Sequence, residues 1–139
     1  MSYLKAKSVF NLDAAEVLIE KHQCYAPSVH CSYFGCFQFI KSKLNEIGIT
    51  YAKMEQDINL SKQNGGTPLT SHKYPISLML KRIEEKTDVY YKRELQNKIK
   101  TLKVYREESD YFNEEVDYNK SNTALKLSRE IIKSIKIKL

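Results

Sequence analysis

Arg106 is the residue whose position most strongly suggests binding or catalytic chemistry. It continues the apolar series of one predicted helix, which runs through Leu95, Ile99 and Leu102. An arginine on a buried helix face needs an anion, a hydrogen-bond acceptor or an opening to solvent. Asp110 follows one helical turn later, so an ion pair within the helix is the simplest structural interpretation.

Two tyrosines beside this pair could extend it into a hydrogen-bonded site. Tyr105 precedes Arg106, and Tyr111 follows Asp110. In a partly buried setting, hydroxyls and charges form networks whose members strengthen one another. We therefore take Arg106, Asp110, Tyr111 and Tyr105 as the candidate ligand-binding residues.

His72 is the candidate proton carrier. It lies in the segment TSHKYP at the start of a predicted helix, where unpaired backbone N–H groups favour an anion. Histidine titrates near neutral pH, so His72 could act as an acid or base if the fold brings it to Arg106. The alternative interpretation is a polar first-turn residue beside a Ser71 cap. Arg106 and His72 are thus the candidate catalytic pair.

The other motifs predict neither a metal nor a cofactor. The histidines and cysteines between residues 22 and 31 fit no common zinc-site spacing. The Gly65-Gly66 pair lacks the Lys-Ser or Lys-Thr ending of a phosphate-binding loop and is typical of a flexible turn.

Helices must position these residues, because helical periodicity recurs in five places and no hairpin pattern or repeat competes with it. Four Gly and three Pro also disfavour an all-β protein. The predicted class is all-α: an up-and-down bundle of four main helices plus a short extra helix, in one domain spanning residues 1–139. The expected helices lie within 4–22, from Pro27 to Gly48, from about Ser71–Pro75, from about Thr87 to Tyr111, and after a cap at Ser121 or Asn122.

The prediction also covers the first helix and residues 48–74. The first helix is expected to be bent or interrupted near Asn11 and Asp13. In residues 48–74, a short helix could begin at Tyr51, whereas residues 61–74 show no periodicity and predict a loop. The core face of the first helix is expected to comprise Val9, Phe10, Ala14, Val17 and Leu18.

The charge of the chain permits a nucleic-acid partner without requiring one. The formal net charge is +6, and residues 118–139 hold six basic groups against one glutamate. An acidic run directly precedes this segment and would repel a phosphate backbone, or could serve charge-complementary docking of two chains. The acidic run consists of Glu107, Glu108, Asp110, Glu114, Glu115 and Asp117.

The location of the protein is predicted from what the sequence lacks. It has three cysteines, no recognisable signal peptide at its start, and no apolar run near the length of about 18 residues that a membrane span needs. We expect a cytoplasmic protein with reduced thiols and no membrane partner.

Two segments resemble the HEPN superfamily of small helical domains, found in prokaryotic toxin–antitoxin, CRISPR-associated and nucleotidyltransferase-linked proteins. The segment YAPSVHCSYFGCFQFIKSKL at 25–44 is similar to the Tyr- and Phe-rich second helix of that family. In the segment 102–135, an Arg-x-x-x-Asp-Tyr element formed by Arg106, Asp110 and Tyr111 precedes a final amphipathic helix.

The resemblance implies a bundle of four or five helices that often dimerises and that, in many members, cleaves RNA without a metal. Those nucleases carry an arginine followed four to six residues later by a histidine. Tyr111 stands where that histidine is expected, and no histidine follows His72. We therefore expect a non-catalytic domain that binds RNA, a nucleotide or a partner protein in a cleft near Arg106.

Two alternatives remain open. One is a metal-independent ribonuclease toxin of a toxin–antitoxin or defence system, with His72 as a substitute base. The other is a structural module that dimerises through its Tyr-rich second helix. The partners that the resemblance implies are a second copy of the chain and a nucleotidyltransferase-type or antitoxin protein.

Overall fold

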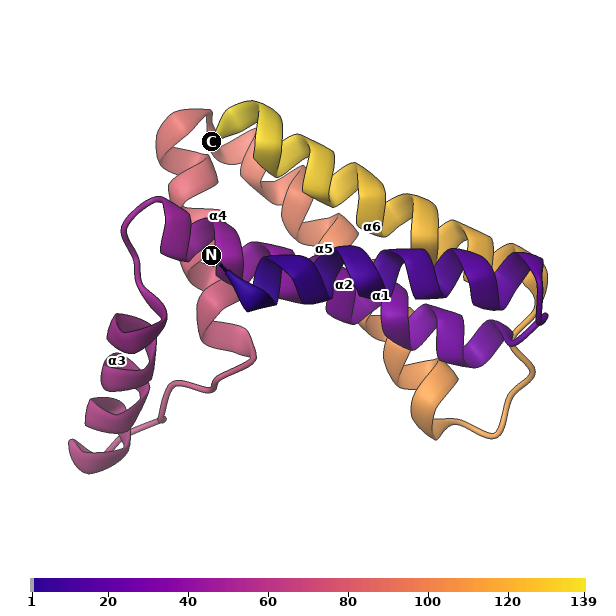
Figure 1. The fold of residues 1–139 in the computed structure, drawn as a ribbon. Helices are drawn as coiled ribbons and strands as arrows, with labels where there is room; N and C mark the ends of the chain where they lie inside the picture. The colour runs from indigo at the N-terminus through magenta and orange to yellow at the C-terminus, as the bar shows by residue number, and fades with distance from the viewer. Residues whose placement is uncertain (1) are drawn as a thin grey trace.

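The computed structural model describes residues 2–139, which form six helices and no strands (Figure 1). Four long helices run up and down along a common direction, α4 lies across one end, and α3 stands apart from the others. The all-α class is confirmed, with two shorter helices in place of the single short helix expected. The helices are α1 (Tyr3–Glu20), α2 (Tyr25–Glu46), α3 (Tyr51–Gln63), α4 (Lys73–Lys86), α5 (Val89–Tyr111) and α6 (Tyr118–Lys138).

Helix α2 is the central element of the fold. Its apolar side chains recur every three or four residues, and α1, α4, α5 and α6 all pack around it. Helix α5 contributes the predicted series Leu95, Ile99 and Leu102, all of which are buried. The hydroxyl of Ser128 on α6 donates to the carbonyl of Ser32 on α2 (2.7 Å), so these two backbones approach closely.

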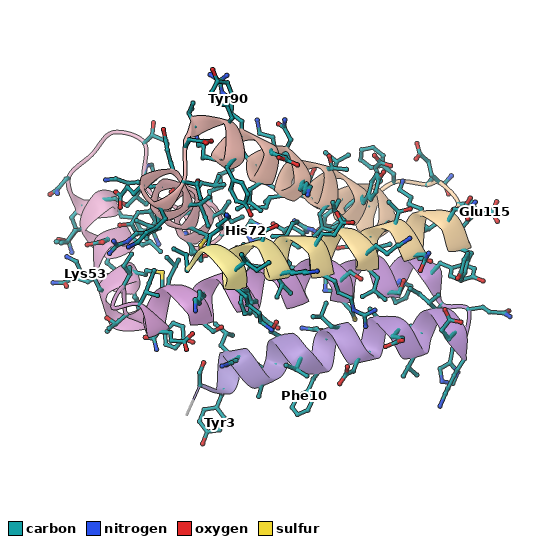
Figure 2. The ribbon with its side chains drawn as sticks, turned by 90° about the horizontal axis from the view of Figure 1, so that it is seen from above. Tyr3, Phe10, Lys53, His72, Tyr90 and Glu115 are labelled. Atoms are coloured by element: carbon teal, nitrogen blue, oxygen red, sulfur yellow. The ribbon has the colours of Figure 1, made fainter. Side chains whose placement is uncertain are left out.

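Helix α1 is continuous, and its predicted core face is wrong. Phe10 is 68% exposed, and Val9 and Val17 are also exposed. Figure 2 shows Phe10 pointing away from the bundle. The face that packs against α2 instead carries Ser8, Leu12, Ala15 and Ile19.

A close approach at Gly35 of α2 explains this choice. A Cβ atom added there would lie 3.0 Å from the Leu12 side chain and 3.3 Å from the carbonyl oxygen of Ser8. The Ser8 hydroxyl donates to the Gly35 carbonyl (2.5 Å). The absence of a Cβ atom at Gly35 therefore lets α1 lie close to α2, with Ser8 and Leu12 packed against this glycine.

Helix α3 is longer than the short helix expected within residues 48–74. Thr50 caps it by accepting from the N–H of Lys53, and Met54 is its one buried residue. The hydroxyl of Tyr74 donates to Asp57 (2.7 Å) and ties α3 to α4. The predicted turn at Gly65-Gly66 has positive φ at both glycines, which suits residues without a Cβ atom.

Two predicted helix caps are also corrected. At the start of α4, the side-chain oxygen of Thr70, and not that of Ser71, accepts a hydrogen bond from the N–H of Lys73. Helix α6 begins earlier than expected because Asp117 caps it, whereas Ser121 is buried inside the helix. Within residues 2–139, no helix combines the length and apolar character that a membrane crossing requires.

Candidate functional site

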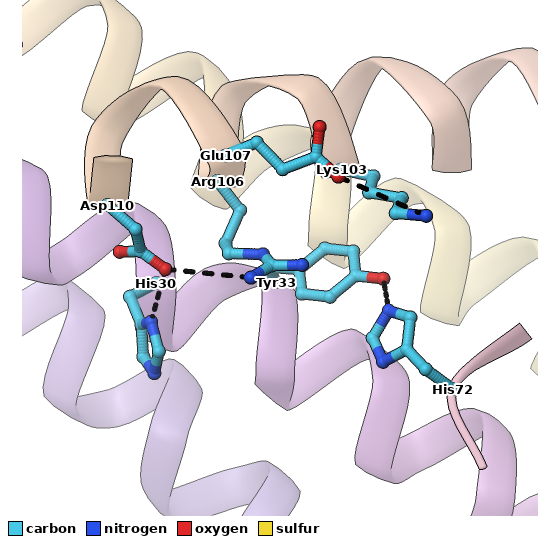
Figure 3. A network of polar contacts seen from close by, with 7 residues as sticks. All are labelled: His30, Tyr33, His72, Lys103, Arg106, Glu107 and Asp110. Carbon is cyan, nitrogen blue, oxygen red and sulfur yellow. Dashed lines mark hydrogen bonds and ion pairs between the residues drawn. The ribbon is translucent and has the colours of Figure 1, made fainter. Parts of the chain in front are cut away.

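The side chain of Arg106 rests on aromatic rings. Its Cζ atom lies 5.0 Å from the ring centroid of Tyr33 (Figure 3). The same atom lies 5.5 Å from the ring centroid of Phe34 and 5.9 Å from that of Tyr111. Tyr33 and Phe34 come from α2, so the packing of α5 against α2 creates this setting. The Arg106 side chain is only 12% exposed, which strengthens its interaction with the π faces of the rings.

Asp110 lies beside Arg106, as predicted, but its hydrogen-bond partner is a residue of α2. Nδ1 of His30 lies 2.9 Å from Oδ2 of Asp110, whereas Nη1 of Arg106 is 3.8 Å from that oxygen. The ion pair within α5 is therefore long. The His30 side chain is half exposed, so its hydrogen bond with Asp110 lies at the surface.

Arg106 has less hydrogen bonding than a buried guanidinium normally requires. Its Nε–H group is buried and has no acceptor among residues 2–139. A buried donor without a partner costs about 1–3 kcal/mol. The positive charge of Arg106 is thus not matched by a hydrogen-bonded carboxylate.

His72 joins the same group of residues from α4. It is the last residue before that helix and makes no capping hydrogen bond through its side chain. Instead its Nε2 atom is hydrogen-bonded to the Tyr33 hydroxyl, and its ring stacks on Phe37 with centroids 4.5 Å apart. The predicted pair, Arg106 and His72, therefore meets at opposite parts of one tyrosine: the ring face and the hydroxyl.

The surroundings of His72 and Tyr33 shift the pKa of each side chain. Burial lowers the pKa of His72, and the positive charges of Lys103 and Arg106 lower it further. Burial raises the pKa of Tyr33 well above its ordinary value, against the opposing charge of Arg106. At neutral pH a protonated Tyr33 hydroxyl and a neutral His72 imidazole therefore share this hydrogen bond, and the tautomer of His72 sets which of them donates.

The two predicted tyrosines have different positions. Tyr111 is 73% exposed, and its ring lies at the edge of the Arg106 side chain. Tyr105 packs against the core, with Nζ of Lys120 on α6 lying 5.4 Å from its ring centroid. The structure therefore brings Tyr111 to Arg106 but places Tyr105 against α6.

Sequence reasoning missed the contribution of α2. His30, Tyr33, Phe34 and Phe37 share one helix face at steps of three and four residues. This spacing is the signal that could have identified them, but it is also the spacing of an ordinary core stripe. We call His30, Tyr33, His72, Arg106 and Asp110 the Arg106 cluster.

The nearby acidic side chains are paired, which changes the interpretation of the acidic run. Glu107 lies 4.0 Å from Nζ of Lys103, and Glu108 pairs with Lys120. Asp110 is held by His30 and Arg106. Glu107 and Glu108 are thus partly neutralised by lysines, and their repulsion of an anionic ligand is weaker than the sequence suggests.

The described residues do not assemble a metal site. Across residues 2–139, no three His, Cys, Asp or Glu side chains are close enough together to hold a metal ion. Burial and the negative charge of Asp110 raise the pKa of the Cys31 thiol, so it remains a poor nucleophile at neutral pH. The available chemistry is therefore that of arginine, histidine, tyrosine and carboxylate groups.

Comparisons of the chain with protein-family models, with curated proteins and with solved structures find no match.

Proposed function

We propose that this chain is a HEPN-like helical domain that binds a phosphate ester of RNA or of a nucleotide at the Arg106 cluster. The observation that carries the proposal is the state of Arg106. Its charge is held on aromatic rings, its Nε–H has no acceptor in the described part of the chain, and the nearest carboxylate oxygen of Asp110 is 3.8 Å from Nη1.

A phosphate group supplies what this arginine lacks. Guanidinium groups bind phosphate oxygens through short, charge-assisted hydrogen bonds. Protonation of the neighbouring His72 on ligand binding would add a second positive charge close to the first. The exposed ring of Tyr111 offers a surface on which a nucleobase can stack.

A ribonuclease is the second candidate, and the two histidines favour it. His72 is kept neutral by its surroundings, and in the tautomer whose Nε2–H donates to the Tyr33 hydroxyl its Nδ1 can accept the proton of a ribose 2′-hydroxyl as that oxygen attacks phosphorus. Cleavage also needs a proton for the departing 5′-oxygen, and His30, oriented by its hydrogen bond to Asp110, is the candidate donor. The bond to the 5′-oxygen breaks as the new bond to the 2′-oxygen forms, while Arg106 stabilises the negative charge on the non-bridging phosphate oxygens.

Dimerisation and binding of a nucleotidyltransferase-type or antitoxin protein remain predictions. The Tyr-rich helix α2 is surrounded by α1, α4, α5 and α6. Little of its surface is therefore left for a second copy, which makes a binding function the better-supported proposal.

Fluorescence anisotropy with a labelled single-stranded RNA tests the proposal. Loss of one phosphate contact in the Arg106→Gln variant should weaken binding about tenfold or more, because a charged hydrogen bond contributes about 1.5–3 kcal/mol. Arg129→Gln is the matched control, since Arg129 is an exposed residue of α6 that pairs with Glu16. Equal affinities of the two variants would contradict the proposal.

A further inference from the structure

A groove between α4 and α5 lies next to the Arg106 cluster. It has a volume of about 380 Å³ and opens to solvent. Apolar side chains from both helices and three lysines line it: Ile76, Leu80, Ile99, Lys73, Lys100 and Lys103.

The charge in this groove has a single sign. No carboxylate lines it, and its remaining polar side chains are a serine and a glutamine. Neither Lys73 nor Lys100 has a carboxylate within 4.0 Å in the described chain. Nζ of Lys103 lies 4.0 Å from Oε1 of Glu107, so the charge of Lys103 is partly offset. The groove therefore presents positive charge above an apolar floor, which suits a ligand with an anionic group and a flat apolar part.

The groove and the Arg106 cluster are adjacent along α5 and meet at Lys103. Lys100, Lys103 and Arg106 recur every three residues, and Lys103 borders both sites. Along the helix axis, Lys100 and Arg106 are separated by about 9 Å. Lys73 directly follows His72 in the chain, so the second wall of the groove begins where the cluster ends.

We infer that the α4/α5 groove is a second phosphate subsite, which makes the ligand a single-stranded oligonucleotide rather than a single phosphate ester. This inference rests on the proposed function at Arg106. One phosphate binds Arg106, and a neighbouring phosphate of the same strand binds Lys73 and Lys100. A nucleoside attached to the second phosphate packs against Ile76, Leu80 and Ile99. Because lysines contact phosphates as point charges, this subsite contributes affinity without base specificity.

The test compares two ligands and two double variants. Lys73→Gln/Lys100→Gln removes the groove charges, and Lys126→Gln/Lys133→Gln removes the same net charge from exposed positions of α6. Binding of a labelled eight-nucleotide RNA is followed by anisotropy at several salt concentrations. Binding of adenosine 5′-monophosphate is followed by NMR, and circular dichroism confirms that each variant is folded.

We expect the groove variant to bind the RNA about tenfold more weakly than the α6 variant at low salt. The slope of log affinity against log salt should become shallower by about 0.7, because one phosphate of a single strand is no longer neutralised. Its affinity for the mononucleotide should match that of the α6 variant. Equal RNA affinities and salt slopes in the two double variants would overturn the inference.

The Arg106→Gln variant separates failure of this inference from failure of the proposed function. If Arg106→Gln weakens RNA binding and the groove variant does not, only the second subsite is wrong. If the groove variant weakens binding and Arg106→Gln does not, the groove binds nucleic acid and the proposed role of Arg106 is wrong. A wild-type chain that binds no RNA would overturn both.

Discussion

The hydroxyl of Tyr33 is hydrogen-bonded to Nε2 of His72, although 39 positions separate the two residues in the sequence. Tyr33 also supports the guanidinium of Arg106 on its ring face. One buried tyrosine therefore links the predicted arginine to the predicted histidine, and substitutions around it separate structural roles from binding roles.

Tyr33→Phe should destabilise the fold while leaving Arg106 in place. The phenylalanine ring keeps the cation–π contact, but Nε2 of partly buried His72 loses its hydrogen-bond partner. We expect a loss of about 1 kcal/mol in the free energy of unfolding, measured by urea denaturation. Unchanged stability would show that this hydrogen bond has no structural role.

The stability of the fold should decrease as the pH is lowered through the range in which His72 titrates. Burial and nearby positive charge depress the pKa of His72 below its ordinary value near 6.5. The unfolded chain therefore binds a proton at higher pH than the folded chain does. The stabilisation is fully present above the unfolded-state pKa and is lost as the pH falls through the folded-state pKa.

Denaturation curves of the wild-type chain and His72→Gln, collected between pH 8 and pH 5, check this expectation. The difference in the pH dependence of their unfolding free energies isolates the contribution of His72. Parallel curves would contradict the depressed pKa of this residue.

Asp110→Asn should affect binding and catalysis in opposite directions. Removing the carboxylate leaves Arg106 and His30 without their shared negative neighbour. Binding of an RNA ligand should tighten severalfold, because less negative charge faces the phosphate. Any RNA cleavage should become slower, because His30 loses the group that orients it.

Anisotropy and a gel-based cleavage assay in the presence of a chelator measure these two effects separately. Weaker RNA binding by Asp110→Asn would contradict phosphate binding at Arg106. Cleavage that is absent from the wild-type chain, or unchanged in Arg106→Ala, His72→Ala and His30→Ala, would remove the ribonuclease candidate.

Two substitutions in α1 test which face of that helix is buried. Ile19→Ala should cost about 2–5 kcal/mol because Ile19 is buried against α2 and α6. Phe10→Ala should change stability by no more than about 0.5 kcal/mol because Phe10 is exposed. Comparable losses from the two substitutions in urea denaturation would contradict this packing of α1.

The sequence predicted those parts of the fold that depend on local periodicity. Leu95, Ile99 and Leu102 follow the helical repeat, which identified the buried face of α5 and placed Arg106 on it. Phe10 was assigned to the core because apolar character alone does not show that α1 packs on Gly35 of α2 through Ser8 and Leu12. That contact comes from the approach of two helices, which no local pattern contains.

In the site, likewise, the sequence predicted only the contact that lies within one helix. Arg106 and Asp110 are one helical turn apart, so their proximity follows from helix geometry. The contact of His72 with Tyr33 depends on how α4 lies across the bundle, and the hydrogen bond of His30 to Asp110 depends on the packing of α2 against α5. These are tertiary relationships between residues whose spacing along the chain carries no signal.

A crystal structure of the chain with a bound short RNA tests the central claim most directly, through the distance from Arg106 to the nearest phosphate. We predict a phosphate oxygen about 2.7–2.9 Å from a guanidinium nitrogen of Arg106. A phosphate bound instead along the exposed lysines of α6, with Arg106 still turned onto Tyr33 and without a ligand, would contradict the account.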